Sequence, residues 1–138
     1  MRVFLDANVL VSVLNKEYPL FPYSARLLSL ADQSRFQLFT SPICLAIAFY
    51  FAEKKAGSAM AKQKIAILHS KLNISIVDQE VVYQALKNPQ VIDFEDGLEY
   101  FSAINSSCEV IVTEDQSGFF FSDIPVYDCR KFLEKEVY

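Results

Sequence analysis

The sequence predicts a three-layer α/β/α sandwich whose central sheet has about five mostly parallel strands. Short apolar segments that suit buried strands alternate with longer segments of helical periodicity, and this alternation is typical of a parallel sheet with helices on both faces. The chain has 138 residues, of which 52% are hydrophobic, so we expect one domain with one core over residues 1–138. Three glycines and five prolines are too few for a β-sandwich or a disordered chain.

Each expected strand has a helical segment before or after it. The expected strands cover residues 3–5, 36–40, 74–77, 110–113 and 124–127. The first expected helix covers residues 9–14 and is capped by Asn8, and those that follow cover 24–31, 42–55, 58–72, 78–86 and 93–105, with a last helix capped by Asp128. Ser41 and Pro42 suit the start of the third helix, and Gly57 suits its end.

The composition favours a cytoplasmic protein without a membrane span. The longest uncharged stretch, residues 36–52, is too short to cross a bilayer and is interrupted by Pro42. The opening residues resemble a strand interrupted by Asp6 and not a signal peptide. An odd number of cysteines without CxxC spacing favours reduced thiols, namely Cys44, Cys108 and Cys129.

Charge is distributed unevenly along the chain. The net charge is −4, yet residues 53–71 hold five lysines and one glutamate, whereas residues 78–99 hold six acids and one lysine. One helical segment could therefore contact phosphate while another holds a cation. Two solvated helix faces of opposite sign explain the same pattern equally well.

Four aspartates are expected at one edge of the sheet. Asp6 follows the first strand, and Asp115 lies two residues after the fourth. Asp93 and Asp96 are three residues apart in the first turn of a helix and share a face. Ligand sites of open parallel sheets lie beyond the carboxyl ends of the strands. Oxygen ligands of this kind suit Mg²⁺ or Mn²⁺, which can activate water for phosphodiester hydrolysis.

Each acid also has a structural explanation. Asp93 suits a helix cap, and Asp115 suits an Asx-turn. Asp6 is harder to explain without a function, because a carboxylate beside apolar neighbours is costly unless it is paired. Glu95 and Glu99 are expected to be surface charges.

Four short motifs resemble those of PIN domains. They are VFLDANVL from Val3, DFEDGL from Asp93, VIVTED from Val110 and SDIPV from Ser122. Each motif is short, but their order and spacing agree with the family over nearly the whole chain. The chain is therefore similar to PIN nucleases of the VapC-like type.

The resemblance implies a metal-dependent endoribonuclease that acts as the toxin of a bacterial toxin–antitoxin pair. It further implies an RNA substrate, an antitoxin protein as partner, and a homodimer. Asp6, Asp96 and Asp115 match the catalytic and metal-binding acids of the family, and Asp93 matches a less central metal ligand. The residues expected to contact the substrate are Asn8, Thr113, Lys54 and Lys55.

Several positions depart from the family pattern. Ile47 stands where an inward acid is usual, Ala7 replaces a Thr or Ser, Glu114 replaces an Arg, and Gly118 replaces a second Asp. These departures keep open a second hypothesis, a catalytically impaired PIN-like domain that binds protein or RNA. A phospho-receiver domain ranks last, because no Lys follows Thr113 as that class requires.

Overall fold

Five parallel strands form the centre of the molecule in a computed structural model that describes residues 1–138. The sheet has the order β3-β2-β1-β4-β5, and all four pairs of neighbouring strands are parallel. The strands are β1 (Arg2–Leu5), β2 (Gln37–Thr40), β3 (Asn73–Ile74), β4 (Val110–Val112) and β5 (Val126–Tyr127). The predicted α/β/α fold is confirmed, with a sheet that is wholly parallel.

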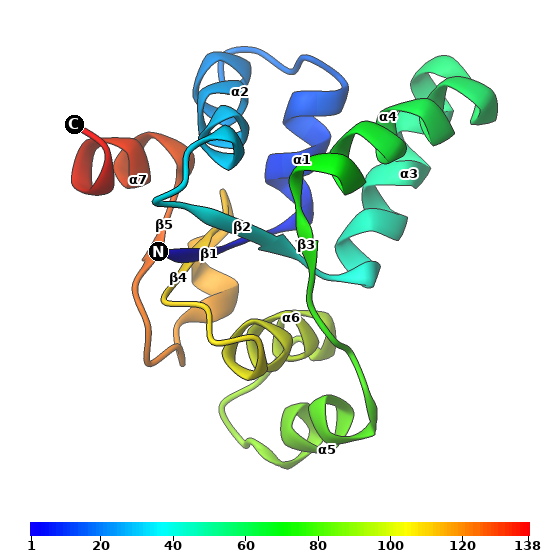
Figure 1. Ribbon diagram of the computed structural model, residues 1–138. Helices are drawn as coiled ribbons and strands as arrows, with labels where there is room; N and C mark the ends of the chain where they lie inside the picture. Colours follow the sequence, from blue (N-terminus) through cyan, green and yellow to red (C-terminus); the bar gives the residue numbers. More distant parts are fainter.

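Helices cover both faces of this sheet. Figure 1 shows α1 and α2 on one face and α6, followed outward by α5, on the other. The hairpin of α3 and α4 packs against α1. The helices are α1 (Ala7–Leu14), α2 (Phe21–Ser29), α3 (Pro42–Ala56), α4 (Ser58–Lys71), α5 (Gln79–Lys87), α6 (Phe94–Asn105) and α7 (Cys129–Glu136), with short 3₁₀ turns η1 (Leu30–Asp32) and η2 (Gln116–Phe119). No helix has the length and apolar character needed to span a membrane.

The core is built on the central strand. Val3, Phe4 and Leu5 of β1 have no exposed surface, because helices cover both of their faces. Phe119 and Phe132 close the core from η2 and α7. Such continuous burial explains why the first strand is a run of apolar residues and not an alternating pattern.

The strand order reverses between β1 and β4. The chain passes from β1 to β2 and β3 in one direction, and then returns to the other side of β1 for β4 and β5. In open α/β sheets this reversal leaves a crevice at the carboxyl ends of the two central strands. Asp6 and Thr113, which directly follow β1 and β4, therefore lie side by side at the base of that crevice.

Four expectations about element ends are corrected by the structure. The cap of the first helix is Asp6 and not Asn8, because β1 passes into α1 without a loop. The strand expected at residues 74–77 pairs only over Asn73–Ile74, and Ile76 is 63% exposed at this edge of the sheet. The last strand is likewise shorter than expected, and α2 begins at Phe21, three residues earlier than expected. Apolar composition marks where a strand lies, but not how far an edge strand pairs.

Candidate active site

The four predicted aspartates lie around one pocket at the carboxyl edge of the sheet. The pocket has a volume of about 410 Å³. Besides the aspartates it is lined by Asn8, two glutamates and an apolar wall; the complete lining is Asp6, Ala7, Asn8, Val11, Glu17, Ile47, Phe51, Asp93, Glu95, Asp96 and Asp115. No Lys, Arg or His side chain is among these residues, so nothing basic in the lining compensates the carboxylates.

Asp6 is held rigidly at the floor of the pocket. Its Oδ1 accepts a hydrogen bond from the Ala7 backbone N–H at 2.7 Å, and its Oδ2 accepts one from the Thr113 hydroxyl at 2.8 Å. The backbone N–H of Asp6 donates to the Val112 carbonyl at 3.0 Å and so continues the pairing of β1 with β4. Asp6 is only 9% exposed. Its position is therefore set by both central strands.

Thr113 supports the site from within and does not face a substrate. Its hydroxyl donates to Asp6, accepts from Asn8 Nδ2 at 3.2 Å, and accepts from the Asp115 backbone N–H at 3.1 Å. A hydroxyl has one proton and two lone pairs, so these three bonds use its whole capacity. Thr113 is fully buried. Of the expected substrate contacts, Asn8 lines the pocket, whereas Thr113 fixes the aspartates.

Asp93 and Asp96 enter the pocket from the start of α6. Asp93 caps this helix, with Oδ1 accepting from the backbone N–H groups of Glu95 at 2.9 Å and Asp96 at 3.4 Å. Capping and a place in the pocket are thus compatible for Asp93. A Cβ atom added to Gly118 would lie 2.2 Å from Asp96 Oδ2, so the absence of a side chain at residue 118 makes room for this carboxylate.

Asp115 reaches the pocket from the segment after β4. Its Oδ1 accepts a hydrogen bond from the Ser117 hydroxyl at 2.8 Å, which is a local turn contact of the kind expected for an Asx-type residue. The neighbouring residue, Glu114, points elsewhere: its Oε2 accepts from the Cys129 backbone N–H at 2.8 Å. The departure from Arg at this position therefore contributes to the start of α7.

Mutual repulsion and burial change the acidity of the pocket. The pKa of Asp96 is raised to about 7, first by burial and then by the negative charges of its neighbours, in the order Asp93, Asp6, Asp115 and Glu95. Burial also raises the pKa of Asp6, against the effect of its bond from Thr113. The two salt bridges of the molecule, Lys71–Asp32 and Arg130–Glu134, involve none of these acids. A set of carboxylate oxygens without a basic partner fits the ligand preference of a hard divalent cation such as Mg²⁺ or Mn²⁺.

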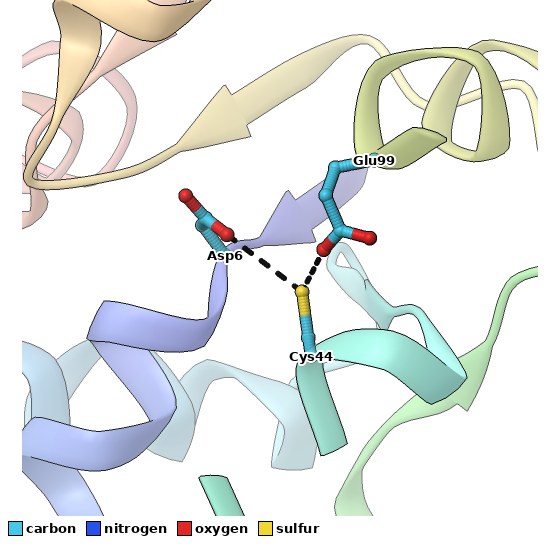
Figure 2. A group of neighbouring side chains, drawn as sticks. All are labelled: Asp6, Cys44 and Glu99. Carbon is cyan, nitrogen blue, oxygen red and sulfur yellow. Dashed lines mark hydrogen bonds between the residues drawn. The ribbon is translucent and has the colours of Figure 1, made fainter. Parts of the chain in front are cut away.

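A second acidic group lies behind Asp6 and was expected at the surface. Glu99 is 1% exposed, and its Oε1 accepts a hydrogen bond from the Ser41 hydroxyl at 2.7 Å. Its Oε2 accepts from the Cys44 thiol, and Cys44 Sγ lies 3.7 Å from Asp6 Oδ1 (Figure 2). The expectation of a surface charge is wrong for Glu99. Glu95 is exposed as expected, but it lines the pocket.

The signal for Glu99 was present in the sequence, in the helical periodicity of α6. Glu99 lies three and four residues before Ser102 and Ala103, which are small and fully buried, so all three share the inward face. Cys44 carried a weaker signal, because a free cysteine in an apolar helix is usually a simple core residue. Burial raises the pKa of the Cys44 thiol well above its usual value, with Glu99 as the next cause.

The two lysines expected to contact the substrate lie outside the pocket lining. Lys55 Nζ donates to the Asn15 carbonyl at the end of α1, and Lys54 Nζ lies 5.1 Å from the centre of the Tyr50 ring. The same helix does face the pocket through Ile47 and Phe51. Ile47 is thus placed where an acid on α3 would meet the aspartates.

Comparisons with known proteins agree with this geometry. A family model described as PIN domain matches residues 2–117. Ribonuclease VapC1 of Aquifex aeolicus (strain VF5) is 25% identical in an alignment that covers 97% of this chain and 94% of that protein.

Two solved structures have the same fold. A chain in the structure of VapBC2 from Rickettsia felis, bound to a DNA fragment from their promoter, has a TM-score of 0.69 and 21% identity, covering 93% of this chain and 98% of that one. Mycobacterium tuberculosis VapC20, described as a sarcin–ricin loop cleaving toxin, has a TM-score of 0.66 and 17% identity, covering 89% of this chain and 98% of that one.

Proposed function

Because the chain belongs to the PIN-domain family, we propose that it is a metal-dependent endoribonuclease of the toxin–antitoxin type. The observation that carries the proposal is the pocket itself. Four aspartates from three separate segments surround it, and no basic side chain is in its lining. Such a pocket repels a phosphodiester unless cations occupy it. A bound divalent cation reverses that repulsion.

Asp6, Asp96 and Asp115 are the residues that would hold Mg²⁺ or Mn²⁺, with Asp93 in a supporting position. When bound, the cation would act as a Lewis acid on the phosphate and would lower the pKa of the attacking water. Thr113 orients Asp6, and the Asp93 cap holds the first turn of α6 that carries Asp96. Asn8 lies at the pocket wall, where one N–H of its amide donates to Thr113 and the other would donate to a ribose or phosphate oxygen.

The apolar side of the pocket gives the substrate a second surface. Ile47 and Phe51 lie one helical turn apart on α3, and Phe51 is 43% exposed. An aromatic ring beside a cation site suits stacking with an unpaired base. We propose single-stranded RNA as the substrate on this ground, together with the names of the ribonuclease and the RNA-cleaving toxin to which the chain is similar.

An antitoxin protein, together with the homodimer that the family resemblance implies, completes the proposal. The solved relatives include VapBC complexes from Rickettsia felis and nontypeable Haemophilus influenzae. A chain that degrades RNA in its own cell needs an inhibitor. The antitoxin is therefore the partner that we expect to copurify with this protein.

The test is Mn²⁺-dependent cleavage of a generic single-stranded RNA. We expect cleavage with Mn²⁺ or Mg²⁺, none in excess chelator, and a loss of at least about 100-fold in Asp96→Asn. Asp123→Asn is the matched control, because Asp123 is an exposed aspartate outside the pocket and its loss is expected to change nothing. Cleavage that survives in Asp96→Asn, or that proceeds in chelator, contradicts the proposal.

A PIN-like domain that binds without cutting is the second candidate. Ile47 favours it, since an apolar side chain occupies the wall where an acid on α3 is usual. Glu114 favours it as well, since it stands in place of the usual Arg. Its carboxylate accepts a hydrogen bond at the start of α7, and the pocket therefore lacks the positive side chain that would contact phosphate. Metal and RNA binding without any cleavage in the same titration supports this second candidate.

A further inference from the structure

A mixed set of oxygen and sulfur donors lies beneath the open pocket. Asp6, Cys44 and Glu99 are all buried, and each offers one donor atom within 4.8 Å of the other two. Figure 2 shows that they come from three elements: the end of β1, the first turn of α3 and the inward face of α6. Cys44 and Glu99 are absent from the pocket lining, so this group lies behind Asp6 as seen from solvent.

Two donor atoms of this group have no partner outside it. Cys44 Sγ makes hydrogen bonds to Glu99 and Asp6, and the one hydrogen bond to Glu99 Oε2 comes from Cys44. Both residues are essentially inaccessible to water, with exposures of 0% and 1%. No Lys, Arg or His side chain pairs with either carboxylate. Asp6 also accepts hydrogen bonds from the Ala7 N–H and the Thr113 hydroxyl, whereas Glu99 accepts only two, from the neutral Ser41 hydroxyl and the Cys44 thiol. A buried carboxylate with so few partners and no basic side chain beside it favours a bound cation.

We propose that Asp6, Cys44 and Glu99 form a site for a thiophilic divalent cation of the Zn²⁺ class, distinct from the oxygen-only site of the open pocket. Zinc takes Cys, His and carboxylate ligands, and a site with three protein ligands leaves a fourth position for water. Ligand atoms on a tetrahedral zinc lie about 3.5 Å apart, so Cys44 Sγ and Asp6 Oδ1, at 3.7 Å, need little movement, whereas Cys44 Sγ and Glu99 Oε2 must move apart when the cation replaces the thiol proton between them. Binding requires the thiol to release its proton to solvent.

The thiol is what separates this site from the one proposed for catalysis. Mg²⁺ prefers oxygen ligands and does not favour sulfur, whereas thiolate selects softer metals such as zinc. Asp6 belongs to both the inner site and the open pocket. Its Oδ1 lies beside Cys44 Sγ, and the residue also lines the pocket. Because Asp6 is one of the three donors, occupancy of the inner site is expected to depend on that residue as well.

Cobalt is the probe, because Co²⁺ replaces Zn²⁺ and reports sulfur ligation by a thiolate-to-metal charge-transfer band in the near ultraviolet. We expect the chelator-treated wild type to show this band on Co²⁺ addition and to lose it on adding Zn²⁺. The band disappears in Cys44→Ser, a variant that keeps a donor for Glu99 and a similar volume. Absence of the band in the wild type, or its persistence in Cys44→Ser, overturns the proposal.

Cys129→Ser is the matched control. Cys129 is also fully buried, and burial and Glu114 raise its thiol pKa, but it belongs to no group of three donors. We expect Cys129→Ser to keep the band. Circular dichroism checks that this variant is folded. Loss of the band in the folded variant assigns the sulfur ligand to Cys129 and overturns the proposal.

Glu99→Gln tests the carboxylate. We expect it to weaken Zn²⁺ binding by at least about tenfold in a competition titration, while the charge-transfer band on Co²⁺ remains at saturation. Unchanged Zn²⁺ affinity removes Glu99 from the site and overturns the three-residue assignment. These measurements contain no RNA, so their outcome is separate from that of the nuclease proposal.

Discussion

Two single residues, Thr113 and Gly118, decide how the aspartates of the pocket are placed. Thr113 joins Asp6, Asn8 and Asp115 through one hydroxyl group. Gly118 acts by having no side chain, because any Cβ would displace Asp96. Neither residue needs to contact RNA in order to matter for activity.

Thr113→Val is expected to destabilise the protein and loosen the metal site. It removes the donor to Asp6 Oδ2 and leaves Asn8 and the Asp115 N–H without their acceptor, at a cost of about 1–3 kcal/mol in the free energy of unfolding. We expect Mn²⁺ affinity to fall by about 10–100-fold. Denaturant unfolding and metal titration provide the two measurements.

Thr113→Ser is the control for that change. It keeps the hydroxyl and removes one methyl group, so we expect Mn²⁺ affinity close to that of the wild type. Equal losses of affinity in the Val and Ser variants would show that packing, and not the hydroxyl, positions Asp6.

At the level of elements, the start of α6 combines a capping role with a functional one. Asp93, Glu95 and Asp96 all lie at the amino end of this helix, where the backbone dipole favours negative charge. The dipole and the cap offset part of the repulsion among the acids. The helix can thus present several carboxylates to one pocket.

Asp93→Ala and Asp93→Asn separate the two roles of this residue. Asn keeps a side-chain oxygen that caps α6, whereas Ala does not, so we expect Ala to lower the free energy of unfolding by about 1 kcal/mol relative to Asn. Both remove the charge, so both are expected to weaken Mn²⁺ binding by a similar factor. Equal stability of the two variants, measured by chemical denaturation, would rule out a stabilising cap.

At the level of the whole molecule, several acidic side chains without a basic partner lie where the strand order reverses, between β1 and β4. Burial raises the pKa of Glu99 from its ordinary value of 4.5 to about 7, against the effect of its hydrogen bonds from Cys44 and Ser41. The folded, metal-free protein therefore binds this proton more tightly than the unfolded chain does. The contribution of Glu99 to stability is greatest below its unfolded pKa and is lost as the pH rises through its folded pKa.

Glu99→Gln is expected to make the metal-free protein more stable relative to the wild type as the pH rises from 4.5 to about 7. Gln carries no charge to bury, so the relative gain reaches on the order of 3 kcal/mol and then stays constant. Thermal or urea unfolding in chelator, at intervals from pH 4.5 to 8, measures the difference. Glu80→Gln, at an exposed position on α5, is the control and is expected to show no such trend. A difference between wild type and Glu99→Gln that does not vary with pH contradicts the raised pKa.

Much of the fold could be predicted because its determinants are local. Alternation of apolar strands with helical periodicity, the Ser41–Pro42 start of α3 and the Asp128 cap of α7 all depend on residues near in sequence. The short β3 could not be predicted, because the extent of an edge strand depends on its one neighbour and on the absence of a covering layer. The cap at Asp6 was misplaced because it depends on how directly β1 leads into α1.

The sequence by itself determined the parallel α/β architecture and the four aspartates expected at one edge of the sheet. The carboxyl ends of parallel strands share one edge, which places Asp6 and Asp115 there, and helical spacing places Asp93 and Asp96 on one face of α6. Only the tertiary structure decided that Thr113 supports the site from within, that Lys54 and Lys55 lie outside the pocket, and that Glu99 and Cys44 meet beneath Asp6. Those contacts join residues up to 107 positions apart. They depend on how helices from opposite faces of the sheet pack at the reversal between β1 and β4, which periodicity and spacing do not specify.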